Sequence, residues 1–115
     1  MKINIFPAVI ALIIAGLLAY LFYAISKDDD TALATTIAGF ITTGTVLEGM
    51  MGIKLPDLKH TTNLRLLSNL FFVVALVFNL IAALVGMSLP FIIIFGGLIW
   101  VFYLLAAYSI VKIKM

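Results

Sequence analysis

Cysteine is absent from this 115-residue sequence, and histidine occurs once, at His60. Without a cysteine or a second histidine, the chain has no ligand set for a structural zinc ion, a haem or an iron–sulfur cluster. It also has no disulfide framework. The serines have no histidine in an apolar segment to activate them, so nucleophilic catalysis lacks a base. We therefore expect no enzymatic activity, no metal site and no cofactor.

Charged residues are scarce as well. They make up 10% of the chain, whereas 65% of it is hydrophobic. A soluble domain needs more charge than this to cover its surface. The formal net charge of +2 comes from basic residues near the ends of apolar segments, as is usual in small membrane proteins. These numbers argue against a nucleic-acid partner and predict an integral membrane protein whose first partner is the lipid bilayer.

Four apolar segments are each long enough to cross a bilayer, which takes about 20 helical residues. They cover about residues 7–26, 31–53, 64–87 and 89–111. The first is longer than the core of a signal peptide, so we expect it to be retained. A hairpin at 27–30 and a loop at 54–63 complete the connections. The sequence predicts an all-α, single transmembrane domain over 1–115, with four helices in an up-down-up-down bundle.

The basic residues set the orientation, because cytoplasmic loops retain lysine and arginine. Six of the seven fall on one side of the predicted bundle: Lys2, Lys54, Lys59, Arg65, Lys112 and Lys114. Only Lys27 falls on the other side, next to three aspartates. We therefore predict that both termini and the loop 54–63 are cytoplasmic, in a bacterial inner membrane. This bias argues against an antiparallel dimer and favours a parallel homo-oligomer with its axis along the membrane normal.

The second apolar segment has a seam of small and hydroxylated residues. Its members are spaced by alternating steps of four and three: Thr31, Thr35, Ala38, Thr42, Thr45, Gly49 and Gly52. Such a seam lets another helix approach closely, and threonine hydroxyls can bond back to their own helix. Alternatively, several copies of this helix around an axis would give a water-lined pathway. Both interpretations remain open from the sequence.

Glu48 is the one acidic residue within a predicted segment. It lies roughly 9 Å inward from Lys54 at 1.5 Å per residue, on the cytoplasmic side. One hypothesis is that it forms an ion pair with Arg65 or a hydrogen bond with Asn69, which begin the third segment from the same surface. The other is that it titrates, or attracts cations, at the inner mouth of a pore.

The third segment carries a stripe that includes two asparagines, which are unfavourable in lipid unless covered. The stripe consists of Arg65, Asn69, Phe72, Leu76, Asn79, Ala83 and Gly86. We predict that this face points inward, either to fix helix register by hydrogen bonding or, at Asn79, to form a constriction. In the fourth segment Trp100 and Tyr103 lie too centrally for an interfacial belt, so we expect Trp100 or Tyr103 to contact protein.

Three functions fit these patterns. The first is a small homo-oligomeric channel or membrane-permeabilising pore with Thr35, Thr42 and Thr45 near the axis and Glu48 toward the cytoplasmic mouth. The second is a non-catalytic anchor or regulatory subunit that docks a cytoplasmic protein through the loop from Lys54 to Asn63, for instance as an effector in a bacterial defence system. The third is a small proton-coupled transporter that uses Glu48, although no helix in the sequence is clearly broken at mid-membrane.

Overall fold

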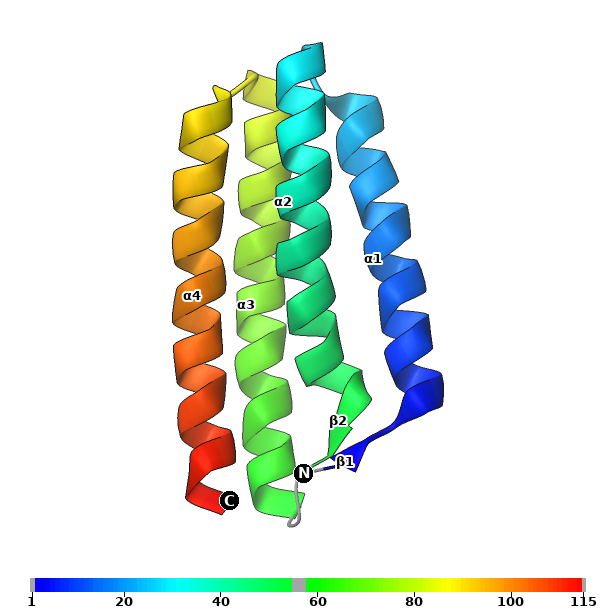
Figure 1. The fold of residues 1–115 in the computed structure, drawn as a ribbon, viewed down its shortest axis with the longest axis vertical. Helices are drawn as coiled ribbons and strands as arrows, with labels where there is room; N and C mark the ends of the chain where they lie inside the picture. Colours follow the sequence, from blue (N-terminus) through cyan, green and yellow to red (C-terminus); the bar gives the residue numbers. More distant parts are fainter. Residues whose placement is uncertain (1, 55–57, 115) are drawn as a thin grey trace.

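The computed structural model describes residues 2–54 and 58–114, with side chains for 3–54 and 59–110. Four helices run side by side in alternating directions, so that Lys2 and Lys114 lie at the same end (Figure 1). The order along the chain is β1, α1, α2, a π-helical turn (η1), β2, α3 and α4. The predicted all-α helical bundle is confirmed, and the strands are an addition.

Helix α1 (Ile5–Ile25) contacts the rest of the molecule through alanines. Ala11, Ala15 and Ala19 are buried at successive turns, and the first two form an apolar cluster with Leu47. Small residues four apart let two helices approach closely in a membrane. Phe22 extends this contact and is fully buried. The other side of α1 carries large exposed apolar residues.

Helix α2 (Asp29–Leu47) is the central element, because it packs against α1, α3 and α4. Asp28 caps its N-terminus by accepting a hydrogen bond from the backbone N–H of Thr31 at 2.8 Å. The α-helix ends at Leu47, before the predicted end of this segment at residue 53. A single π-helical turn, η1 (Glu48–Gly52), follows and contains two glycines, which are poor α-helix formers.

A short antiparallel ladder closes the end of the bundle where the chain begins. The N-terminal strand β1 (Lys2–Ile3) pairs with β2 (Ile53–Lys54), which follows η1 directly. The backbone N–H of Asn4 continues the contact by donating to the carbonyl of Gly52 at 2.9 Å. The start of the chain is thereby tied to the residues immediately after Glu48.

Helices α3 (Leu58–Val85) and α4 (Leu89–Lys114) form a tight hairpin. Gly86 ends α3 with a positive φ of 79°, a conformation that L side chains rarely adopt. The backbone N–H groups of Gly86 and Met87 both donate to the carbonyl of Ala82 at 3.1 Å. This C-terminal cap turns the chain sharply into α4.

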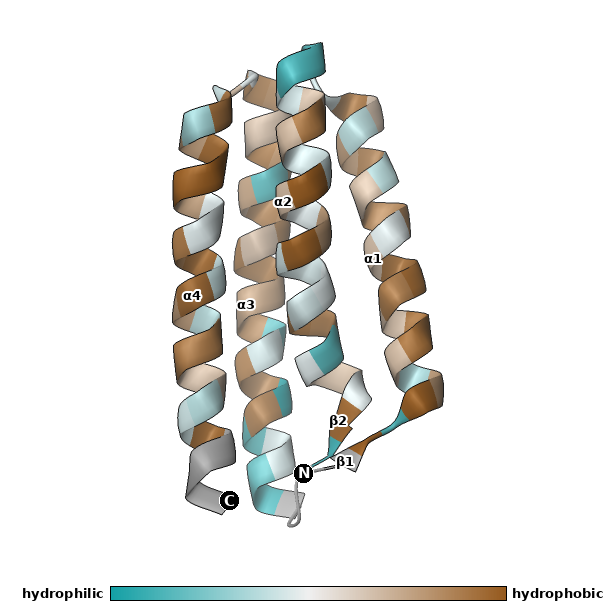
Figure 2. Cartoon of the chain, in the orientation of Figure 1, coloured by the Kyte–Doolittle hydropathy of each residue, from teal (hydrophilic) through white to brown (hydrophobic). Residues whose placement is uncertain are grey.

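Three helices are long and apolar enough to cross a membrane: Ile5–Ile25, Lys59–Val85 and Leu89–Ile110. Their length and composition support a membrane protein. Among the described residues α2 is not a fourth such helix, because threonines, glycines and two aspartates in its first turn lower its hydropathy. Figure 2 shows this contrast: α1 and α4 carry broad hydrophobic bands, whereas the first turn of α2 is hydrophilic.

Candidate functional site

Buried threonines gather on the inner side of α2, where it faces the other three helices. Thr35 and Thr43 are fully buried, and Thr42 is 3% exposed. The opposite side of α2 exposes Leu33, Ile37, Phe40 and Ile41. The helix therefore turns its hydroxyl groups toward its own chain and its large apolar side chains outward.

The threonine hydroxyls are bonded within α2 itself. Thr35 Oγ1 donates to the carbonyl of Thr31 at 2.8 Å, Thr42 Oγ1 to that of Ala38 at 2.7 Å, and Thr45 Oγ1 to that of Ile41 at 2.7 Å. Such back-bonding satisfies a hydroxyl without water. These three hydroxyls therefore need no water in this conformation.

Groups of α3, of α4 and of the turn between them also contact the seam at several levels. Near the hairpin end, Thr31 Oγ1 donates to the backbone carbonyl of Met87 at 2.9 Å. Midway, Asn79 Nδ2 donates to Thr42 Oγ1 at 3.3 Å. Further toward the termini, Trp100 Nε1 donates to Thr45 Oγ1 at 2.9 Å. Each contact ties α2 to α3 or α4 and fixes the rotation of the central helix.

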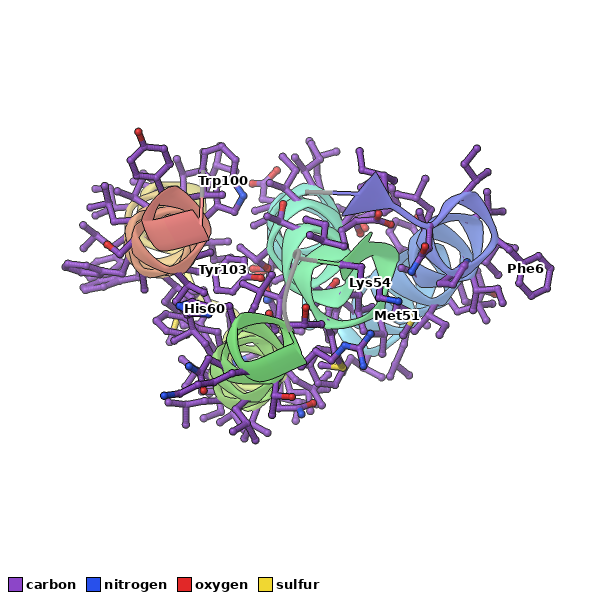
Figure 3. All side chains as sticks on the ribbon, turned by 90° about the horizontal axis from the view of Figure 1, so that it is seen from below. Phe6, Met51, Lys54, His60, Trp100 and Tyr103 are labelled. Carbon is purple, nitrogen blue, oxygen red and sulfur yellow. The ribbon has the colours of Figure 1, made fainter. Side chains whose placement is uncertain are left out.

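Trp100 and Tyr103 both contact protein, as predicted from their positions in α4. Figure 3 shows them on the side of α4 that faces α2 and α3. The Tyr103 hydroxyl is 2.7 Å from Ser68 Oγ on α3, and the pair lies directly against Gly49 of η1. The sequence alone did not reveal the Ser68–Tyr103 pair, because nothing in it indicates which residues of separate helices meet.

Glu48 begins the π-helical turn, at the point where α2 ends. Its Oε1 atom is buried and has no hydrogen-bond partner among the residues that the structure describes. Its Oε2 atom lies beside Gly52, where an added Cβ would be 2.8 Å away, and Ala8 of α1 borders the same glycine. The carboxylate therefore lies in a small space between η1 and the first turn of α1, which the small residues Gly52 and Ala8 border.

The predicted partners of Glu48 lie elsewhere. Arg65 and Asn69 are exposed on the outer side of α3, and neither is bonded to Glu48 among the described residues. The prediction that Glu48 forms an ion pair with Arg65 or a hydrogen bond with Asn69 is thus wrong within a single chain. The prediction that the whole stripe of α3 faces inward holds for Asn79, which is fully buried, and fails for Arg65 and Asn69.

The physical reason is the difference between a heptad repeat and a straight α-helix. A stripe spaced by sevens drifts by about 20° per heptad, so the two heptads between Arg65 and Asn79 rotate it by about 40°. In addition, the α-helical part of α2 stops at Leu47, so it covers less of α3 near the termini. Arg65 therefore lies about 40° around α3 from Asn79, beside the buried Leu64 and Ser68, and is exposed.

Asn79 also has an unsatisfied atom. Its Nδ2 donates to the backbone carbonyl of Ala75 at 2.8 Å as well as to Thr42, but its buried Oδ1 has no partner. Gly39 passes close to the amide, where an added Cβ would be 3.6 Å from Asn79 Cγ. Two acceptor oxygens, on Glu48 and Asn79, thus lie inside the bundle without a donor.

No group of three or more metal-ligating side chains occurs among the residues that the structure describes. Of the predicted loop 54–63, residues 58–63 belong to α3 instead, and residues 55–57 lie outside the described residues. The docking role of this segment stays a prediction. His60 has bonding partners within the structure. No family model, no curated protein and no solved structure matches this chain.

Proposed function

We propose that the protein moves a cation or a proton across the membrane, with Glu48 as the group that binds it. The observation that carries this proposal is the buried, unpartnered Oε1 atom of Glu48 at the point where α2 breaks. A carboxylate in an apolar bundle is unfavourable unless something compensates its charge. A bound cation or proton would supply that compensation.

The proposed arrangement in the membrane follows the basic residues. All four helices cross, with α2 partly shielded from lipid by the other three, and both termini and the loop 54–63 are cytoplasmic. The protein works as a parallel homo-oligomer in a bacterial inner membrane. The exposed Asn69 on α3 supports the oligomer, because an amide facing lipid has no water to bond and is better covered by a second copy.

A small homo-oligomeric channel or pore is the first form of this proposal. The seam of α2 offers an ion no free hydroxyl in this conformation, because the hydroxyls of Thr35, Thr42 and Thr45 are bonded within the chain. Conduction would therefore require α3 and α4 to shift away from the seam, or a path between copies that reaches Glu48. Either route gives a gated channel rather than a permanently open one.

A proton-coupled carrier is the second form, and one feature favours it specifically. Transporter sites commonly lie where a membrane helix is interrupted, since the break frees backbone groups and makes room for an ion. The change from α-helix to π-turn between Leu47 and Glu48 is such an interruption. Isolated π-helical turns are also frequent at functional sites.

Purified protein in liposomes distinguishes these forms. We expect cation or proton flux that falls by about tenfold in Glu48→Gln, equivalent to losing about 1.4 kcal/mol of ion stabilisation. Asp57→Asn removes one carboxylate from the loop and serves as the charge-matched control, with wild-type flux expected. A channel gives voltage-driven flux that does not saturate with one solute, whereas a carrier gives saturable, proton-dependent exchange.

Flux equal to that of empty liposomes, over several voltages and pH values, would overturn both forms. A docking role of the loop 54–63 would then become the leading alternative. Its signature is co-purification of a soluble protein that depends on the loop sequence. Equal flux in the wild type and Glu48→Gln would mean that the protein transports ions but that Glu48 takes no part in transport.

A further inference from the structure

An apolar groove runs lengthwise between α2 and α4. It has a volume of about 380 Å³ and is lined by small and aliphatic residues together with one threonine and one tryptophan: Ala34, Ile37, Ala38, Ile41, Thr42, Leu89, Ile93, Gly96, Gly97 and Trp100. Thr42 Oγ1 and Trp100 Nε1 are both hydrogen-bonded within the protein. The groove therefore offers no polar atom that needs a ligand, and a hydrocarbon chain suits its walls.

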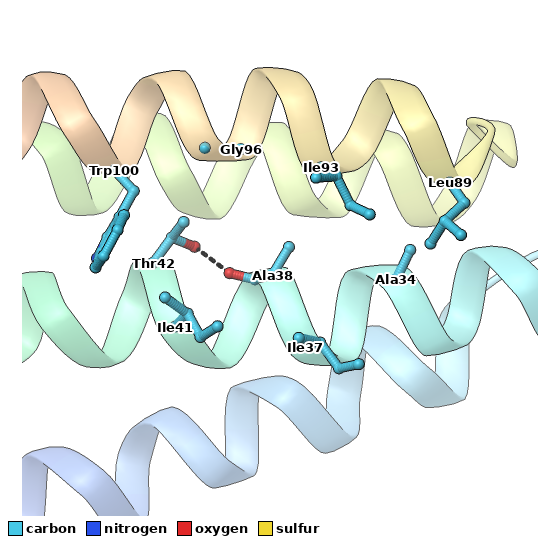
Figure 4. Close-up of a pocket in the computed structure, with 10 residues that line it drawn as sticks. Ala34, Ile37, Ala38, Ile41, Thr42, Leu89, Ile93, Gly96 and Trp100 are labelled. Atoms are coloured by element: carbon cyan, nitrogen blue, oxygen red, sulfur yellow. Dashed lines mark hydrogen bonds between the residues drawn. The ribbon is translucent and has the colours of Figure 1, made fainter.

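Trp100 forms the floor of this groove. Its indole reaches from α4 toward α2 (Figure 4). The hydrogen bond from Trp100 Nε1 to Thr45 Oγ1 fixes it there. From Leu89 at the open end to Trp100 the groove spans about 16 Å at 1.5 Å per residue. That is close to half of the roughly 30 Å hydrocarbon core. The groove thus has the depth of one leaflet, and a helix that crosses both leaflets would meet the indole.

A polar hollow at the surface adjoins the groove at its Leu89 end. Leu89 lines both spaces, and the hollow is otherwise bordered by Asp28, Asp29, Asp30, Thr31, Gly86, Met87, Ser88 and Pro90. Asp28 is engaged as the cap of α2, whereas Asp29 and Asp30 are exposed. Three carboxylates against one nearby cation, Lys27, give the hollow a negative charge.

We propose that the groove and the hollow together bind one membrane lipid from the leaflet on the hairpin side. One acyl chain fills the groove down to Trp100, and a head group that carries an amine lies at the aspartates. The apolar walls, the one-leaflet depth and the opposite charge of the hollow each select the same kind of molecule. The head-group end of this site lies at the other end of α2 from Glu48, and lipid binding there is tested without any measurement of ion movement.

The chain has a single tryptophan, which makes the test direct. Vesicles contain equal amounts of phosphatidylethanolamine and phosphatidylglycerol, and bromine atoms, which quench indole fluorescence, are placed on the acyl chains of one lipid or the other. The two vesicle preparations have the same lipid composition and differ only in which lipid is brominated. We expect brominated phosphatidylethanolamine to associate with the site beside Trp100 about two- to fivefold more strongly than brominated phosphatidylglycerol. This is the range typical of exposed ion pairs.

Two glycines provide a matched pair of variants, since an added Cβ at Gly97 or at Gly16 meets nothing within 4 Å. Gly97→Leu fills the groove and should remove the preference, whereas Gly16→Leu on α1 should leave it unchanged. The double variant Asp29→Asn with Asp30→Asn should retain quenching by either lipid but lose the preference for the amine.

Equal quenching by the two lipids in the wild-type protein would overturn the proposal, because it is what ordinary bulk lipid would give. If Gly97→Leu still prefers the amine lipid, the groove is not the cause of that preference. A preference that survives the double aspartate variant would contradict the assignment of the head group to the hollow. The wild-type comparison needs no variant, so a variant that fails to insert leaves that first result standing.

Discussion

Gly49 lies where three elements meet, and its lack of a side chain makes that meeting possible. A Cβ at this position would collide with the Tyr103 hydroxyl and would lie 2.9 Å from Ser68 Oγ. We expect Gly49→Ala to destabilise the protein by about 1–3 kcal/mol, the range for overpacking a closely packed contact. The measurement is the free energy of unfolding in detergent micelles under denaturant.

Gly97→Ala is the control, since its Cβ meets nothing within 4 Å and alanine favours helix over glycine. It should leave stability unchanged or raise it by up to about 1 kcal/mol. Removing the hydroxyl in Gly49→Ala with Tyr103→Phe should recover part of the loss. A Gly49→Ala protein as stable as Gly97→Ala would mean that Gly49 does not need to be small.

At the same scale, the sequence identified Glu48 and Asn79 but not what surrounds them. A carboxylate and an amide in apolar segments are conspicuous because their burial is unfavourable. Their surroundings depend on how four helices rotate about their axes, and a spacing pattern leaves that rotation open by tens of degrees. For this reason Asn79 was placed inward correctly, whereas Arg65 and Asn69 were not.

At the scale of elements, the start of α2 depends on one cap. The hydrogen bond from the backbone N–H of Thr31 is the main cause that lowers the pKa of Asp28 below its usual value. Because the pKa is lower in the folded than in the unfolded state, the carboxylate stabilises the fold above the unfolded pKa, about 3.9. That stabilisation is lost as the pH falls through the lower, folded pKa.

Two substitutions separate the cap from its charge. Asp28→Asn keeps a good N-cap residue that does not titrate, so the unfolding midpoint should depend less on pH below about 4. Asp28→Ala removes the cap and should lower the midpoint at neutral pH as well. The check is thermal unfolding followed by circular dichroism from neutral to acidic pH. Identical acid profiles for the wild type and Asp28→Asn would contradict the assignment.

The lengths of the helices were easier to anticipate than the break in α2. Apolar runs of sufficient length are visible in a sequence, which is why the bundle of helices could be predicted. The π-turn and the β1–β2 ladder both involve the chain after Leu47, where Gly49 and Gly52 weaken the helix and Ile3 pairs with Ile53. Pairing between residues so far apart in sequence leaves no local pattern to detect.

For the whole molecule, the exposed amide on α3 makes the proposed oligomer testable. The chain has no cysteine, so a single introduced cysteine is a clean probe. We expect Asn69→Cys to be joined between copies by a short bifunctional maleimide in membranes, because a second copy covers this position. Leu105→Cys on α4, where the native residue is 60% exposed, is the control for a lipid-facing site in the same half of the bundle.

The expected outcome is a cross-linked species for Asn69→Cys that is several-fold more abundant than for Leu105→Cys and persists when the protein is diluted in lipid. Dilution matters because random collisions fall with surface density, whereas a specific interface that buries a polar group remains intact. If both variants cross-link equally and the product disappears on dilution, α3 faces lipid. The unpartnered Oε1 of Glu48 would then have to be compensated within one chain, and ion movement would have to be explained by a monomer.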